Sequence, residues 1–294
     1  MRLPWLFFRS LRPKQWVKNL FIFAPMIFSL RFFHPGTVWR ATLAFLLFGL
    51  VTGSIYVIND CIDRDRDRFH PRKRTRPIAS GALGVKPALA GAVLLLALAM
   101  VLVFHFDRGF FLLGLIYVLM NLLYSIILKR IVILDVMVIA FGFVLRVMIG
   151  GVIDDIPLSP WILIITFLGS LFLALIKRRQ EMIKLNRPGE AETTRTSLKS
   201  YNLPLLDQLI SVTTATTLIS YIMYVVNPGI QMKFHTQKLY FTIPFLVFGL
   251  FRYLYLTYIQ EKGESPEEVL FTDLPFTLNL LVWLLVFVLL IVYQ

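Results

Sequence analysis

The stretch ATLAFLLFGLVTGSIYVINDCIDRDRDRFHPRKRTRPIASG, residues 41–81, contains the two features that decide the fold. Its first part, 41–58, carries no charged residue, and its second part, 59–81, holds four aspartates among a dense run of bases. An apolar run of this length is typical of a helix that crosses a bilayer. Charged groups are costly inside the bilayer, so we expect these ones at a water-facing helix end. The stretch therefore predicts a membrane span with a polar site at one end.

Apolar runs of this kind recur along the 294-residue chain, which is 57% hydrophobic and has a mean hydropathy of +0.74. Backbone groups inside a bilayer must bond within the chain, so the runs are expected to be helices. No connection is long enough for a separate soluble domain, which predicts a single all-α polytopic domain over 1–294. Its nine predicted transmembrane helices are 19–33, 41–58, 87–106, 110–128, 131–153, 160–176, 205–227, 239–259 and 274–293.

The lysines and arginines are distributed unequally between alternate connections, with 24 on one side, five on the other and Arg146 within a span. Because cytoplasmic connections are enriched in these residues, we expect the N-terminus in the cytoplasm and the C-terminus outside a plasma (inner) membrane. Connections 59–86 and 177–204 then face the cytoplasm. Contact with anionic membrane lipids explains the net charge of +13 without a nucleic-acid partner. Residues 1–18, basic and rich in Trp and Phe, predict an interfacial amphipathic segment.

The acids of the opening stretch share one face if the helix continues through 59–67, and only Asp65 then points away. Crowded carboxylates take up protons or a cation, and oxygen ligands suit Mg²⁺ bound to substrate phosphates. The alternative is a solvated helix end whose acids pair with Arg64, Arg66, Arg68 and their neighbours. The predicted metal ligands are Asn59, Asp60, Asp63 and Asp67, with Mg²⁺ as the ion and Mn²⁺ as a substitute.

Bases beside a carboxylate-bound metal predict a polyanionic ligand, because arginine forks match phosphate oxygens and lysine acts as a point charge. The candidates are Arg72, Lys73, Arg74 and Arg76, and we expect Lys73 and Arg76 to bind phosphate. His70 lies beside them, but the four histidines are too scattered to predict a metal site. The single cysteine, Cys61, has no partner for a disulfide.

The stretch 59–81, which ends in PIASG, resembles the first aspartate-rich motif of the UbiA superfamily of intramembrane prenyltransferases. The resemblance implies nine transmembrane helices around a central cavity with a cytoplasmic cap. Ordinary members carry a second motif, DxxxD, between helices six and seven, and both motifs bind Mg²⁺ and the diphosphate of an isoprenyl donor. Here KRRQE, residues 177–181, stands in that place, so a lysine replaces the first acid and only Glu181 keeps acid character.

Three more segments resemble the decaprenyl-phosphate phosphoribosyltransferase branch of that superfamily. They are LRPKQWVKNLFIFAPM (11–26), YSIILKRIVILDVMVIAFGFVLRVMIGG (124–151) and SLKSY (197–201). The resemblance implies transfer of 5-phosphoribose from phosphoribosyl pyrophosphate (PRPP) to a polyprenyl phosphate at the cytoplasmic face, with release of pyrophosphate. In that branch the product serves cell-envelope biosynthesis.

Both substrates of this reaction are strongly anionic, so cations are needed to bring them together. The predicted catalytic residues are Asp60, Asp63, Lys73 and Asp135. The predicted substrate-binding residues are Lys14, Gln15, Lys18, Asn19, Arg76, Tyr124, Lys129, Arg146, Lys177, Arg178, Glu181 and Tyr201.

Several of these residues have a second interpretation. Asp135 is expected in the polar cavity, near the ribose hydroxyls, whereas Arg146 serves either substrate binding or a pairing between helices. The two tyrosines, Tyr124 and Tyr201, also suit an aromatic belt at the membrane interface. Glu181 could instead pair with Lys177 one helical turn away.

Two other functions fit parts of the sequence. An ordinary prenyltransferase, moving an isoprenyl group from its diphosphate to an aromatic or other small acceptor, shares the fold and the first motif but not KRRQE. A transporter would explain the spans but not the oxygen cluster beside its bases. The sequence leaves a homo-oligomer open.

Overall fold

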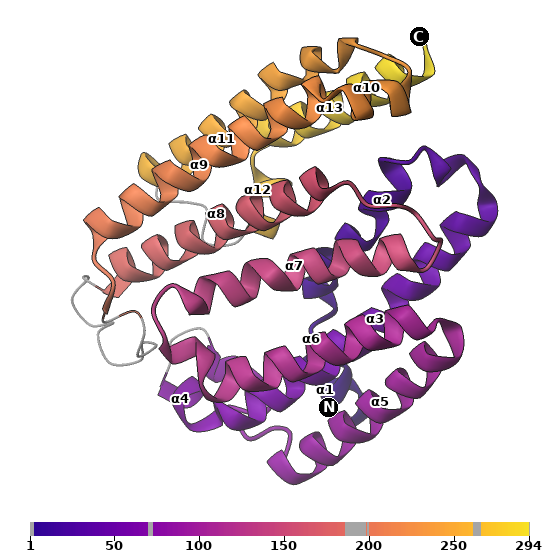
Figure 1. Ribbon diagram of the computed structural model, residues 1–294. Coiled ribbons are helices and arrows are strands. Elements are labelled where there is room, and N and C mark those ends of the chain that lie inside the picture. Colours follow the sequence, from indigo (N-terminus) through magenta and orange to yellow (C-terminus); the bar gives the residue numbers. More distant parts are fainter. Residues whose placement is uncertain (1–2, 70–72, 186–197, 199, 261–265, 294) are drawn as a thin grey trace. The chain divides into compact units, whose positions relative to one another are not determined.

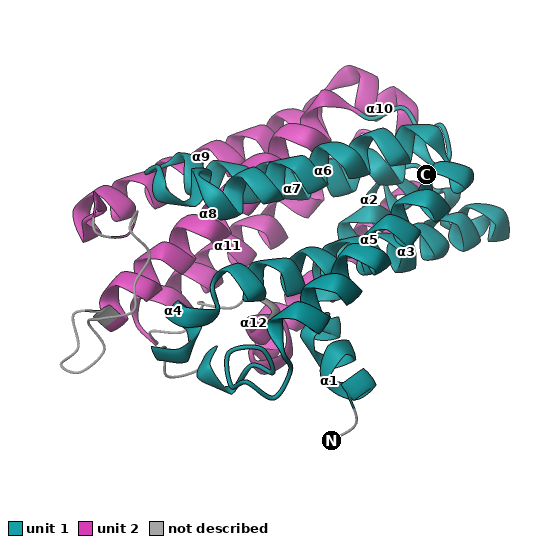
Figure 2. Ribbon diagram, turned by 90° about the horizontal axis from the view of Figure 1, so that it is seen from below, with its two compact units in different colours: residues 1–158, 191–197 teal, residues 159–190, 198–294 magenta. Residues whose placement is uncertain are grey.

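The computed structural model describes residues 3–69, 73–185, 198, 200–260 and 266–293, which are helical almost throughout and contain no strand (Figure 1). They form two compact units, drawn in different colours in Figure 2. Unit 1 comprises residues 1–158 and 191–197, and unit 2 comprises 159–190 and 198–294.

The elements follow one another along the chain without long irregular stretches among the described residues. In unit 1 they are α1 (Leu3–Ser10), η1 (Pro13–Phe23), α2 (Ala24–Ile27), η2 (Arg31–Phe33), α3 (Pro35–Ile62), α4 (Arg64–Phe69), η3 (Lys73–Thr75), α5 (Val85–Phe106), α6 (Arg108–Ile126), η4 (Leu128–Arg130) and α7 (Leu134–Val152). Unit 2 contains α8 (Pro160–Leu185), α9 (Leu203–Val226), α10 (Pro228–Phe234), η6 (Lys238–Thr242), α11 (Ile243–Tyr258), α12 (Pro266–Thr272) and α13 (Leu274–Val292).

Eight helical segments in the described part of the chain are long and apolar enough to cross a membrane. They coincide with the predicted spans from 41–58 onward, and the seventh of them, Lys238–Tyr258, combines η6 with α11. The predicted all-α polytopic fold is confirmed.

The first predicted span, 19–33, is the exception, because it does not form one long helix. Its residues belong to the 3₁₀ helix η1, to the four-residue α2 and to η2. Pro25 removes a backbone donor near the start of α2, and Leu30 adopts a left-handed conformation with φ of 60° that ends the helical path before η2. The expected ninth long helix is therefore replaced by short helical pieces.

Helix starts are fixed by local sequence signals. Asp107 caps α6 by accepting a hydrogen bond from the Phe110 amide at 2.7 Å, and Asn202 caps α9 by accepting one from the Leu205 amide at 2.8 Å. Proline occupies the first or second position of α3, α9, α10, α11 and α13, where its missing N–H costs nothing.

Two glycines let the N-terminal segment of unit 1 lie against the long helices. A Cβ on Gly150 of α7 would stand 2.0 Å from the carbonyl oxygen of Ile22, and one on Gly49 of α3 would stand 2.7 Å from the Trp16 ring. Small residues allow this close approach between membrane segments. The packing holds η1 against α3 and α7.

Candidate active site

The aspartates of the opening stretch lie where α3 ends. The helix stops at Ile62, Asp63 takes a non-helical conformation (φ −92°, ψ 7°), and α4 begins at Arg64. The predicted shared face of the acids assumes one continuous helix over 59–67, whereas the structure interrupts the helix at Asp63. The amide of Asp67 still donates to the Asp63 carbonyl at 2.9 Å, so the chain keeps a helical course across the break.

Two of the predicted metal ligands, Asp60 and Asp67, contact the same arginine side chain. Asp60 and Asp67 are both only 4% exposed, and the Nη1 atom of Arg76 lies 3.0 Å from Asp60 Oδ1 and 2.5 Å from Asp67 Oδ2. Lys73 Nζ stands 3.9 Å from Asp67 Oδ1. Carboxylates arranged in this way grip a single positive centre between them. Burial lowers the pKa of the Arg76 guanidinium, and the neighbouring positive charge of Arg12 lowers it further.

Arg76 is held in place by the buried turn that follows it. Ile78 is fully buried and Ala79 is 4% exposed, while the Ala79 carbonyl accepts a hydrogen bond from Arg68 Nε at 3.2 Å. Gly81, with φ of 81°, reverses the chain toward α5. The sequence PIASG therefore anchors the connection that returns Arg76 to the aspartates.

The other two predicted metal ligands contact the end of α6 and the turn that follows it. Lys129 Nζ lies 2.8 Å from Asp63 Oδ1, and the Ser125 hydroxyl is hydrogen-bonded to Asn59 Oδ1. Lys129 is 9% exposed, so its ammonium group is largely removed from bulk solvent. Within the described residues, no three His, Cys, Asp or Glu side chains are grouped closely enough to hold a metal ion.

The alternative prediction is that the acids pair with Arg64, Arg66, Arg68 and their neighbours. In the described part of the chain the acids are indeed paired, but not with these three arginines. The described partners are Lys73, Arg76 and Lys129 together with Arg12, which the sequence did not single out. Arg12 Nη2 contacts Asp60 Oδ1 from 48 positions away, and only the fold brings the two residues together. Arg74 is exposed, and Arg72 and His70 lie outside the described residues.

The residues present fit a divalent cation, because Asp60 and Asp67 together supply two carboxylates. Mg²⁺ is commonly held by one or two carboxylates together with water and substrate phosphates, and it does not require an all-protein cage. The place that the Arg76 nitrogen takes between the two carboxylates has the required charge and the required oxygen atoms.

The predicted residues of the N-terminal segment lie on η1 with different exposures. Lys14 is exposed, Gln15 and Lys18 are half-buried, and Asn19 is 1% exposed. The Asn19 amide donates to Thr52 Oγ1 of α3 at 3.3 Å. Asn19 is thus part of the packed interior of unit 1.

Arg146 is buried within unit 1 and connects several elements. It donates to Asn19 Oδ1 at 2.9 Å, to the Gly142 carbonyl at 2.7 Å and to the Tyr117 hydroxyl at 3.1 Å. Its guanidinium also stands 5.4 Å from the centroid of the Phe48 ring. These contacts are those of the interhelical pairing that the sequence left open.

Asp135 and Tyr124 complete the predicted residues of unit 1. Asp135 is fully buried in the first turn of α7, where the helix dipole favours a negative charge. Tyr124 is half-buried on α6, two residues before the end of that helix. Ile133, which precedes α7, has φ of 69°, an uncommon conformation for a β-branched residue.

The basic segment 177–181 forms the C-terminal part of α8 in unit 2. Arg178 is fully buried, and its Nη1 atom lies 2.8 Å from Glu181 Oε2. Lys177 is half-buried on the same helix, and Tyr201, just before α9, is 6% exposed. Glu181 is therefore bound by a buried base, three residues before it in the sequence.

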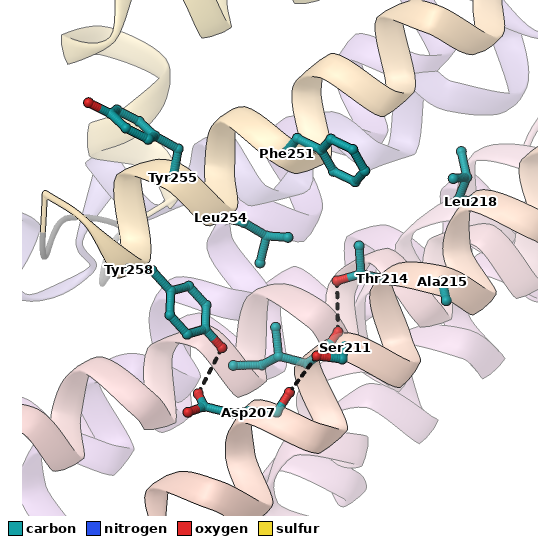
Figure 3. A pocket seen from close by; sticks show the side chains of 10 residues that line it. Asp207, Ser211, Thr214, Ala215, Leu218, Phe251, Leu254, Tyr255 and Tyr258 are labelled. Atoms are coloured by element: carbon teal, nitrogen blue, oxygen red, sulfur yellow. Dashed lines mark hydrogen bonds between the residues drawn. The ribbon is translucent and has the colours of Figure 1, made fainter.

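A groove in unit 2 runs between α9 and α11 (Figure 3). Its walls are mostly apolar, and the hydroxyls of Ser211 and Thr214 donate to backbone carbonyls of the preceding turn. At one end the Asp207 carboxylate accepts hydrogen bonds from Tyr258 Oη and Arg179 Nε, both at 2.7 Å. Nothing in the sequence had indicated Asp207 or Tyr258.

The sequence matches the UbiA prenyltransferase family over residues 20–281. The chain belongs to the UbiA prenyltransferase family. It is 33% identical to the decaprenyl-phosphate phosphoribosyltransferase of Corynebacterium glutamicum over 282 residues, which cover 94% of this chain and 83% of that protein. The enzyme of the same name from Mycolicibacterium smegmatis is 36% identical over 197 residues, 66% of this chain and 61% of its own.

The fold is shared with solved structures of the family. A UbiA homolog from Archaeoglobus fulgidus, bound to DMAPP and Mg²⁺, superposes with a TM-score of 0.73 over 98% of this chain and 99% of its own, at 19% identity. The protein is thus a multi-pass membrane transferase of the UbiA family, and its relatives include the phosphoribosyltransferase branch that the sequence predicted.

Proposed function

We propose that this UbiA-family enzyme transfers 5-phosphoribose from PRPP to a polyprenyl phosphate of the decaprenyl type and releases pyrophosphate. The observation that carries the proposal is segment 177–181, where Lys177 replaces an acid and Glu181 is bound to the buried Arg178. The resemblance implies that family members which bind an isoprenyl diphosphate carry two acids at the place of this segment. The near full-length relative named decaprenyl-phosphate phosphoribosyltransferase supports the same donor and acceptor.

In this proposal the end of α3 binds the diphosphate of PRPP. A divalent cation, Mg²⁺ or Mn²⁺, held by Asp60 and Asp67 would neutralise negative charge on the leaving group. Arg76 and Lys73, which lie beside these acids, are placed to donate to the diphosphate oxygens. Lys129 holds Asp63 and offers a further positive charge at the end of α6.

The chemistry requires little acid–base assistance from the protein. The lipid phosphate is already an anion, so its oxygen can attack C1 of the ribose while the C1–O bond to the diphosphate breaks. The configuration at C1 inverts because attack and departure occur on opposite faces. Positioning and charge stabilisation would then supply most of the rate acceleration.

The distribution of bases supports a site at the cytoplasmic face of a plasma membrane. The end of α3, the end of α6 and the end of α8 all belong to the connections that are rich in lysine and arginine. α1 exposes Leu3, Trp5 and Phe8, which suits a helix lying at the interface.

The second candidate is transfer of an isoprenyl group from its diphosphate to a small acceptor. It is favoured by solved family members bound to DMAPP and to GPP with Mg²⁺. Under that reaction segment 177–181 would be expected to supply acids, and here it supplies bases.

The test is a transfer assay with purified protein, Mg²⁺, decaprenyl phosphate and PRPP labelled in the ribose. The proposal expects label in the lipid phase, and expects EDTA to abolish it and excess Mg²⁺ to restore it. Absence of lipid-phase label, together with transfer from a labelled isoprenyl diphosphate, would favour the second candidate.

A further inference from the structure

Arg12 reaches the centre of the aspartate cluster from the N-terminal segment. Its Nη2 atom contacts Asp60 Oδ1, the same oxygen that lies 3.0 Å from Arg76 Nη1. Asp60 is 4% exposed, so two guanidinium groups converge on one buried carboxylate oxygen. A single carboxylate balances only one of these charges.

The local charge therefore favours an anion. Three bases (Arg12, Lys73 and Arg76) contact two acids (Asp60 and Asp67) in this cluster. A cation bound between the acids would increase the positive excess further. A ligand with several negative charges close together, such as a diphosphate, is the complement of such a cluster.

The backbone at Arg12 is fixed in an uncommon conformation. Arg12 has φ 53° and ψ 62°, the left-handed region that non-glycine residues seldom adopt, and Pro13 follows it. Leu11, its other neighbour, is 5% exposed, and its carbonyl would lie 3.1 Å from a Cβ placed on Gly53 of α3. Packing against α3 thus holds the backbone in this conformation and directs the side chain toward the end of that helix.

The side chain is also oriented by an aromatic ring. The guanidinium carbon stands 5.3 Å from the centroid of the Tyr56 ring, and Tyr56 precedes Asp60 by one turn of α3. The Arg12 side chain is 26% exposed, and the contact with Asp60 takes one of its five N–H donors. Arg12 is therefore held in place and keeps part of its fork accessible to a ligand.

We propose that Arg12 is a further substrate-binding residue, which donates to the diphosphate oxygens of the donor alongside Lys73 and Arg76. The proposal rests on the proposed function, and it makes the N-terminal segment part of the donor site. Arginine suits this role because its planar fork binds two phosphate oxygens at once, which lysine does not.

The test is calorimetric titration of the detergent-solubilised protein with pyrophosphate in the presence of Mg²⁺, which measures binding without turnover. We expect Arg12→Gln to weaken pyrophosphate binding at least tenfold, and Arg12→Lys, which keeps the charge but loses the fork, to weaken it severalfold. The matched control is Arg9→Gln, an exposed arginine on α1, which should bind as the wild type does. Melting temperatures report whether each variant is folded.

The outcomes separate this inference from the proposed function. If Arg12→Gln and Arg12→Lys bind pyrophosphate like the wild type while Arg76→Gln loses binding, Arg12 is not a donor-site residue and the proposed function stands. Should Arg12→Gln not fold, wild-type affinity in Arg12→Lys alone would overturn the inference. A wild-type protein that binds no pyrophosphate would contradict the proposed function itself.

Discussion

The end of α3 in unit 1 and the end of α8 in unit 2 place charge in opposite ways. At α3, the buried Asp60 and Asp67 are bound by the nearby Arg76 and, for Asp60, by the distant Arg12, while the half-buried Asp63 is bound by Lys129. At α8, the charged residues are mainly bases, and the one acid is bound locally by Arg178. The first arrangement suits a cation and the phosphates bound to it, whereas the second suits phosphate alone. Under the proposed function, this difference predicts one metal-binding region, not two.

The largest expected effect comes from removing an acid at α3. Asp60→Ala should lower the transfer rate by about 10³-fold, because several kcal/mol of charge stabilisation at the leaving group are lost. The rate is measured with ribose-labelled PRPP at saturating Mg²⁺. Asp65→Ala is the control, since Asp65 is exposed on α4. Equal losses in the two variants would contradict a specific role for Asp60.

The next largest effect tests the bases of α8. Lys177→Asp restores an acid where ordinary family members carry one, and it should raise the KM for PRPP roughly 10- to 100-fold through loss of a charge-assisted contact and added repulsion. Lys177→Met, which keeps the length without the charge, should lie between this variant and the wild type. Unchanged KM values in both variants would show that the charge of Lys177 plays no part in PRPP binding.

A smaller effect distinguishes Glu181 from the acids of α3. Glu181→Gln should change the transfer rate by less than about threefold, since the carboxylate is bound to Arg178 and is not expected to hold metal. It should lower the stability of the fold by about 1–3 kcal/mol, because the fully buried Arg178 loses a charged partner. Parallel rate and thermal-melting measurements check this. A loss of activity as large as that of Asp60→Ala would indicate a second metal-binding acid.

The smallest effect concerns an acid of unit 1 outside the site. Asp154 lies in the connection after α7, 3.1 Å from Arg40 Nε, and burial raises its carboxyl pKa above the ordinary value of 3.8 despite that partner. Between pH 3.8 and the raised pKa, the folded state therefore binds more protons than the unfolded state. The free energy of unfolding falls as the pH rises through this range. In Asp154→Asn the melting temperature should fall less steeply as the pH rises, and the transfer rate should be unchanged. A steeper fall in the variant would contradict the direction of the pKa shift.

Much of the fold could be predicted from the sequence, because apolar runs between charged connections have few alternatives to helices in a membrane. The failure at 19–33 has a local cause. Hydropathy does not register that Pro25 and the left-handed Leu30 divide an apolar run into short pieces. Close packing of Ile22 against Gly150 then stabilises those pieces in unit 1.

The aspartates of the site were predicted better than their partners. Asp60, Asp63 and Asp67 lie in one short stretch, so their spacing already indicated a shared region. Arg12 and Lys129 reach the same acids only through tertiary packing, and no periodicity links positions 48 or 66 residues apart. The sequence also assigned Arg146 to substrate as one of two interpretations, and its contacts with Asn19 and Tyr117 favour the structural one.

In the proposed function the enzyme uses PRPP as its donor and not an isoprenyl diphosphate. The most direct measurement offers both donors together: PRPP labelled in the ribose and an isoprenyl diphosphate carrying a different label, with decaprenyl phosphate, 4-hydroxybenzoate as the aromatic acceptor and Mg²⁺ present. We expect ribose label in the lipid phase, pyrophosphate in the aqueous phase and no consumption of the isoprenyl diphosphate. Consumption of the isoprenyl diphosphate with no ribose label in the lipid phase would contradict it.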